Sequence, residues 1–115
     1  MGTKMITKAD LVQFKEWTCI VSFQHYRNDR TALRLDEACL VDEPNPFYVN
    51  GECIAVATIN VPEVPLQPDE VIIKNYSENE GMYDCLHKAG YISEPLYHIQ
   101  TGYVTALVCK LLKTE

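Results

Sequence analysis

Apolar and polar residues alternate over much of this chain, as is typical of β-strands that bury one face. The segments TCIVSFQHY (18–26) and TALRLDEACLV (31–41) are rich in β-branched and aromatic residues. The polar break between them, at Asn28-Asp29, predicts a hairpin. Near the C-terminal end, PLYHIQ and YVTALVCKLL flank Thr101-Gly102 and predict another hairpin.

The strongest local turn signal is Asn50-Gly51. A two-residue turn of type I′ needs positive φ angles, which Asn and Gly adopt readily. The pattern therefore predicts that residues 46–49 pair with residues 52–60 across this turn. Both faces of 52–60 are largely apolar, so we expect that strand to lie centrally in a sheet.

Two segments have helical patterns. In TKADLVQFKE (7–16), Thr7 and Asp10 imitate a capping box, and we expect a short helix there. The clearer helix begins at Ser77, since Ser77-Glu78-Asn79-Glu80 is a full capping box and apolar residues follow at helical spacing. Gly90 is placed to end that helix in a left-handed turn.

The order of these elements predicts one α+β domain over residues 1–115. Its sheet is expected to be mostly antiparallel, with about 5–7 strands joined as hairpins, and its two helices pack on one face. Between the halves, the prolines at positions 62, 65 and 68 predict an extended connector, and EVIIKNY (70–76) predicts a short strand or a turn.

Composition narrows the function classes. The chain is 47% hydrophobic and 23% charged, with a net charge of −6, which indicates a soluble protein and argues against direct binding of nucleic acid. No run approaches the roughly 18 apolar residues of a membrane span, and the first residues contain no apolar signal segment. We therefore expect a cytoplasmic protein.

Catalytic and metal-binding patterns are weak. The five cysteines contain no C-x-x-C pair, so the sequence predicts buried reduced thiols and neither a metal site nor a cofactor. The three histidines do not fall in a recognisable nucleophile motif. We expect no enzyme, with a small Cys-dependent enzyme as the remaining alternative.

Acidic residues are concentrated in the middle of the chain. Residues 35–84 hold eleven acidic side chains and a single basic one, whereas residues 1–34 carry an excess of three positive charges. A solvated surface is one interpretation. The other is a negative face that steers the protein onto a basic partner, with carboxylates in place of nucleic-acid phosphates. The candidate partner-binding residues are Asp36, Glu37, Asp42, Glu43, Asp69, Glu70, Glu78 and Glu80, with Tyr76 and Tyr83 as aromatic anchors.

Three pieces of the chain carry a family resemblance: Gly51 to Val61, IKNYSEN (73–79) and Gly102-Tyr103-Val104. Over about residues 33–112 the chain resembles a family of small proteins of unknown function from plasmids, conjugative elements and phages of Firmicutes. The resemblance implies a bacterial host cytoplasm and an inhibitor of a host defence nuclease, of the anti-CRISPR or anti-restriction type. A protein-interaction module that inhibits nothing is the alternative. Asn75 and Asn79 match the shared motif.

Overall fold

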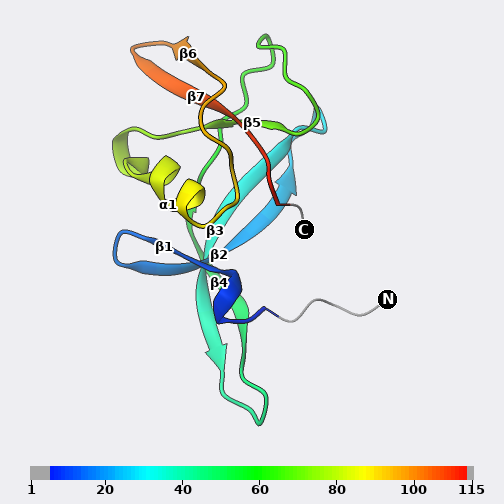
Figure 1. The fold of residues 1–115 in the computed structure, drawn as a ribbon, viewed down its shortest axis with the longest axis vertical. Coiled ribbons are helices and arrows are strands. Elements are labelled where there is room, and N and C mark those ends of the chain that lie inside the picture. Colours follow the sequence, from blue (N-terminus) through cyan, green and yellow to red (C-terminus); the bar gives the residue numbers. More distant parts are fainter. Residues whose placement is uncertain (1–5, 114–115) are drawn as a thin grey trace.

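In a computed structural model, which describes residues 6–113, the chain folds as two antiparallel sheets with little helix (Figure 1). Strands make up 50% of the structure and helical residues 12%. The strands are β1 (Leu11–Phe14), β2 (Trp17–His25), β3 (Thr31–Val41), β4 (Phe47–Val56), β5 (Glu70–Ile73), β6 (Tyr97–Thr101) and β7 (Val104–Lys110). The helical elements are the 3₁₀ turns η1 (Lys8–Asp10) and η2 (Ser77–Asn79) and one α-helix, α1 (Met82–Lys88).

The predicted α+β class, with one sheet and two helices on a face, is therefore wrong. The strands divide into sheet A, in the order β1-β2-β3-β4, and sheet B, in the order β5-β7-β6. The chain changes sheets between β4 and β5, where residues 57–69 contain no named element. Three prolines in that segment cannot donate backbone hydrogen bonds to a ladder, so the strands on its two sides end up in separate sheets.

The main core lies between the two sheets. Sheet A contributes alternate residues of β1, β2 and β3, among them Phe14, Val21 and Leu35, which are all buried. Sheet B contributes Val71 and Ile73 from β5, and α1 adds its own buried residues to the same cluster. Since α1 and sheet B cover one face of sheet A together, the short helix completes this core.

The second face of sheet B is covered by the proline-containing segment. Apolar residues of that segment pack on Ile72 and Val108 in a smaller cluster. Arg30, from the end of the β2–β3 turn, holds the segment in place by donating to the carbonyl oxygens of Val61 (2.9 Å) and Val64. Both faces of β5 and of the adjoining part of β7 are thus covered from within the chain, whereas β6 is largely exposed.

The predicted helix at 7–16 is wrong. Its Thr7–Asp10 contact does form, with the Thr7 backbone N–H donating to the Asp10 carboxylate at 3.0 Å, but it closes only the 3₁₀ turn η1. From Leu11 onward the chain is extended and pairs with β2. Val12 and Phe14 are both buried and alternate with more exposed residues, as in a strand. The backbone hydrogen bonds with β2 outweigh the weak helical pattern of the sequence.

The predicted turn at Asn50-Gly51 is also wrong, because both residues lie inside β4. β4 pairs along its whole length with β3, and the ladder is irregular between Leu35 and Ala38. A side chain at Gly51 would put its Cβ 2.7 Å from the Cys39 Sγ, so glycine is required here for close strand approach and not for a turn. β4 is moreover an edge strand of sheet A and not a central one.

The predicted helix start and capping box at Ser77 are wrong, because the α-helix begins at Met82 and the N-cap residue forms no side-chain cap bond at either η2 or α1. Ser77 adopts a positive φ of 55°, and Gly81, with a φ of 93°, separates η2 from α1. Gly90 ends α1 with a φ of 80°, as predicted. The predicted hairpins at Asn28-Asp29 and Thr101-Gly102 and the short strand in 70–76 are confirmed as β2–β3, β6–β7 and β5.

Candidate functional site

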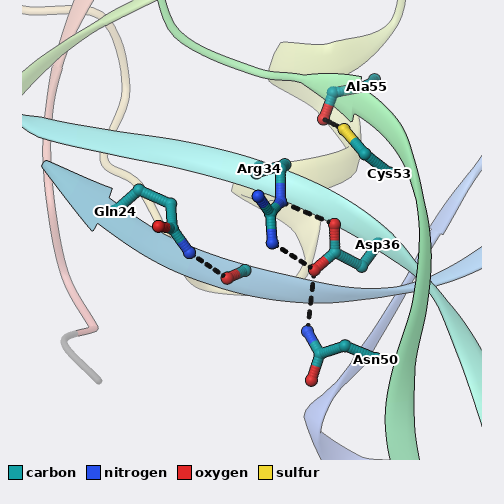
Figure 2. Close-up of polar contacts among 7 residues, drawn as sticks. Gln24, Arg34, Asp36, Asn50, Cys53 and Ala55 are labelled. Atoms are coloured by element: carbon teal, nitrogen blue, oxygen red, sulfur yellow. Dashed lines mark hydrogen bonds and ion pairs between the residues drawn. The ribbon is translucent and has the colours of Figure 1, made fainter. Parts of the chain in front are cut away.

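Asp36, the first of the predicted partner-binding residues, is buried inside the protein. Its side chain accepts hydrogen bonds from Arg34 Nε at 2.8 Å and Arg34 Nη2 at 3.1 Å, and from Asn50 Nδ2 at 2.9 Å (Figure 2). Only 1% of Asp36 is exposed. The bond to Asp36 and its negative charge raise the pKa of Arg34. This carboxylate therefore stabilises the β3–β4 ladder and is not available to a partner.

Most of the other predicted carboxylates also have partners within the chain. The Asp69 carboxylate lies 3.5 Å from Lys110 Nζ, and Glu78 forms an ion pair with Lys74. The hydrogen bond from Lys74 is the main reason that the pKa of Glu78 is lowered. Glu70 accepts a hydrogen bond from the Gln67 backbone N–H at 2.8 Å. Glu37 is half-buried in β3, beside the thiol of Cys39.

The acidic residues do not form one surface. Asp42 and Glu43 are exposed together in the β3–β4 connection, at one end of the molecule, whereas Asp69 and Glu70 lie at the start of β5 in the opposite half (Figure 1). Glu80 is exposed in the link between η2 and α1. Phosphate mimicry was expected to depend on one face that carries all these carboxylates. Of that face, only the exposed pair Asp42 and Glu43 in the β3–β4 connection remains.

The two predicted aromatic anchors are half-buried. Tyr76 packs against the smaller core cluster, with the Lys74 ammonium group 5.6 Å from the centre of its ring. The Tyr83 ring stacks on His87 at 5.1 Å, and burial raises the pKa of its hydroxyl. Both rings are partly occupied by contacts within the chain.

Asn75 and Asn79, from the motif that carries the family resemblance, have structural roles. Asn75 Oδ1 accepts the backbone N–H of Tyr83 at 2.9 Å, which caps the first turn of α1 from outside the helix. Asn79 is 2% exposed and donates its side-chain amide to the Val56 carbonyl oxygen at 2.7 Å. This bond attaches η2 to the end of β4.

A groove with a volume of ≈660 Å³ lies where three segments meet. The β1–β2 turn supplies Lys15 and Trp17, the end of β4 supplies Val56, and the segment after β5 supplies Lys74 and Asn79. Trp17, the single tryptophan of the chain, is 38% exposed, and Val56 is 46% exposed. The groove therefore combines apolar walls with two ammonium groups and the carboxylates of Glu16 and Glu78, and apolar walls with a few polar groups are the usual composition of a binding site.

Lys15 has an unusual backbone at the rim of this groove. Its φ of 55° lies in the left-handed region, which costs a non-glycine residue about 1 kcal/mol or more. Its ammonium group donates to the Glu78 carbonyl oxygen at 2.7 Å and lies 5.2 Å from the centre of the Phe14 ring. These contacts join the β1–β2 turn to η2, and the strained turn is held where it lines the groove.

The groove was not predicted from the sequence, because its lining comes from three distant segments. The signals that could have indicated it were the lone Trp17, which follows directly on two charged residues, and Lys74, the only base within residues 35–84. Both residues were visible in the sequence, but their proximity depends on the division into two sheets.

The cysteines are reduced and differ in exposure. Cys19 and Cys109 are buried, and burial raises the pKa of each thiol to about 11. Cys85 is half-buried, and burial raises the pKa of its thiol to about 11 as well. Cys53 is exposed and borders the groove. The three thiols with a raised pKa are poor nucleophiles, since the thiolate is the reactive form.

Within residues 6–113, no three His, Cys, Asp or Glu side chains are arranged to hold a metal ion. No helix in the same range is long and apolar enough to cross a membrane. No family model matches the chain, and no curated protein or solved structure matches it either. The family resemblance remains a prediction, and the site is interpreted from its own chemistry.

Proposed function

We propose that this protein is a protein-interaction module, not an enzyme, and that the Trp17 groove is its binding surface. The observation that carries the proposal is an exposed tryptophan over a groove of ≈660 Å³. Tryptophan is among the residues that contribute most to protein–protein binding energy, because it gives a large contact area at little entropic cost. Val56 extends the apolar wall beside it.

The charges of the groove indicate the chemistry of the partner. The Lys74 ammonium group is paired with the Glu78 carboxylate, whereas the ammonium group of Lys15 is bonded to a neutral carbonyl oxygen. The carboxylate of Glu16 also lines the groove, so its two positive and two negative charges balance. A partner segment with an apolar side chain against Trp17 and a hydrogen-bond acceptor beside Lys15 matches this arrangement, and it needs no net charge.

The proposal is tested by photocrosslinking in an extract of cells that carry the gene. A benzophenone amino acid is placed at Val56 in the groove and, as a matched control, at Gln67, which is exposed in the proline-containing segment. We expect one protein to be captured from position 56 and not from position 67. Equal capture from both positions would contradict the groove as the binding surface.

Binding of the captured protein is then measured with substituted chains. Trp17→Ala is expected to weaken binding about 30-fold, the equivalent of about 2 kcal/mol for a central aromatic contact. Tyr103→Ala is the control, because Tyr103 is also an exposed aromatic residue but lies outside the groove. If Trp17→Ala binds as tightly as the natural chain, the groove is not the contact surface.

A second candidate function is inhibition of a defence nuclease, in which the partner is a basic nucleic-acid channel. It is favoured by the exposed pair Asp42 and Glu43, which ends the long β3–β4 hairpin (Figure 1). Cleavage by CRISPR and restriction nucleases is measured with an equimolar amount of the protein. We expect inhibition to weaken at high salt and in the double variant Asp42→Asn, Glu43→Gln. Full cleavage in the presence of the natural chain would exclude this function.

A further inference from the structure

The outer edge of β6 is open, whereas the outer edges of β4 and β5 form hydrogen bonds within the chain. At the edge of sheet A, Tyr48 of β4 donates its backbone N–H to the Ile6 carbonyl oxygen at 2.9 Å, and Asn79 bonds to Val56. At the edge of sheet B, Ile59 donates to the Ile72 carbonyl oxygen of β5 at 3.0 Å. β1 is four residues long and lies beside α1.

The backbone groups at the β6 edge can be identified from the pairing. Leu96 donates its N–H to the Val108 carbonyl oxygen at 2.7 Å, so Val108 faces β6. Val108 pairs with Tyr97, and alternate residues of an antiparallel strand face away from the partner strand. His98 and Gln100 therefore point their N–H and C=O groups outward, and nothing within residues 6–113 bonds to those groups.

The same region contains no charge. Residues 95–109 include no Asp, Glu, Lys or Arg, although 23% of the whole chain is charged. Proteins usually protect an edge strand with a lysine, a proline or a bulge that turns it away. Here Leu96 is 49% exposed, Tyr97 is 42% exposed, and Tyr103 at the hairpin turn is fully exposed. The edge is thus open, neutral and flanked by exposed apolar side chains.

We infer that β6 pairs with β6 of a second copy of this chain, in antiparallel orientation about a two-fold axis at Ile99. In this register His98 of one copy exchanges hydrogen bonds with Gln100 of the other, so the outward N–H and C=O groups of both residues are satisfied. Two three-stranded sheets become one sheet of six strands. The turn at Tyr103 then lies beside Pro95 and Leu96 of the other copy, which covers its exposed ring.

Charge favours a second copy as the occupant. The net charge of −6 makes two copies of the chain repel each other on average, and an uncharged contact surface adds no local repulsion to this. Across the proposed register every facing position is uncharged, and Ile99 faces itself. Opposed β-branched and aromatic pairs of this kind stabilise a sheet.

Dimerisation is tested by sedimentation velocity of the full chain from 5 to 500 µM, on the natural sequence and two variants. Gln100→Lys puts a charge on the open edge, and Gln67→Lys makes the same change at an exposed position away from it. We expect a dimer for the natural chain and for Gln67→Lys. For Gln100→Lys we expect a dimer dissociation constant at least 30-fold higher. A natural chain that stays monomeric at 500 µM, or a Gln100→Lys dimer as stable as the natural one, would overturn the inference.

Two further measurements separate this interface from any other self-contact. Raising NaCl from 50 to 500 mM is expected to leave the dimer intact or strengthen it, because salt screens the repulsion between the two negative chains and the contact has no ion pair to lose. Amide hydrogen exchange at His98 and Gln100 is expected to slow as concentration rises, while exchange in β4 does not change. Dissociation by salt, or protection that appears in β4 and not in β6, would overturn the inference.

Discussion

The β3–β4 and β6–β7 hairpins are both antiparallel, but they treat their outer edges in opposite ways. β3–β4 is charged, contains an irregular ladder opposite Gly51, and has edge bonds to Ile6 and Asn79. β6–β7 is regular over β6, has no charged residue before Lys110 at the end of β7, and is open along β6. Because edge protection prevents association, the difference indicates which edge is closed by the chain itself and which is left for another molecule.

Removing the buried carboxylate is expected to damage the β3–β4 hairpin most. Asp36→Ala removes three hydrogen bonds to a carboxylate that is 1% exposed, and since each such bond contributes about 1 kcal/mol we expect a loss of about 3 kcal/mol of unfolding free energy. Urea unfolding measures the loss. Asp42→Ala, an exposed carboxylate of the same hairpin, is the control and is expected to cost less than about 0.5 kcal/mol. Equal losses in the two variants would show that the network does not stabilise the fold.

Gly51→Ala is expected to have the next largest effect, about 2 kcal/mol. The new Cβ would lie 2.7 Å from Cys39 Sγ and 3.2 Å from the Glu37 carbonyl oxygen, so the Cys39 side chain and the backbone of β3 must shift. Thermal unfolding measures the change. The double variant with Cys39→Ala removes the closest atom, and it is expected to recover part of the loss. No recovery would place the strain elsewhere in the ladder.

The matched change in the other hairpin, Gly102→Ala, is expected to cost less, about 1 kcal/mol. Gly102 has a φ of 62°, which strains any side-chain-bearing residue, but nothing lies within 4 Å of the new Cβ. Thermal unfolding at low concentration measures this variant beside Gly51→Ala. If Gly102→Ala loses more unfolding free energy than Gly51→Ala, backbone strain costs more in this protein than steric contact, contrary to the expectation.

Ionisation of the buried thiols is expected to have the smallest effect on stability at neutral pH. Cys53 on β4 is exposed, whereas burial raises the pKa of Cys109 on β7 from 9.0 to about 11. Folding favours the neutral thiol, so its contribution to stability is complete below pH 9 and is lost as pH rises through about 11. In an iodoacetamide pulse at pH 8, mass spectrometry should find Cys53 modified first. Equal rates at Cys53 and Cys109 would show that β7 opens readily.

Local patterns predicted the strands better than their arrangement. The turns at Asp29 and Gly102 were recognisable because polar or glycine residues interrupt clear alternation, and both have positive φ angles in the structure. Gly51 looked equally like a turn, yet its glycine provides close approach of two strands. A short motif does not distinguish these uses, since the distinction depends on which strand lies opposite.

The candidate site was less predictable than the fold. The sequence shows how many carboxylates the chain has, but not where they lie in the fold. Their positions depend on partners far away in sequence, as Asp69 with Lys110 shows. The groove could not be predicted for the same reason. Lys15 and Glu78 are far apart in the sequence and come together only in the folded chain. Side chains with distant partners are determined by tertiary structure, and composition alone cannot place them.

The bonds around Asp36 also determine how β4 can be aligned during folding. Side chains alternate between faces, so shifting β4 by one residue would move Asn50 to the opposite face and deprive the carboxylate of one donor. Since no tight turn connects these strands, their connection alone leaves the alignment open. The misaligned hairpin would keep its backbone ladder but lose a buried bond, and this penalty selects a single alignment from several of similar backbone energy.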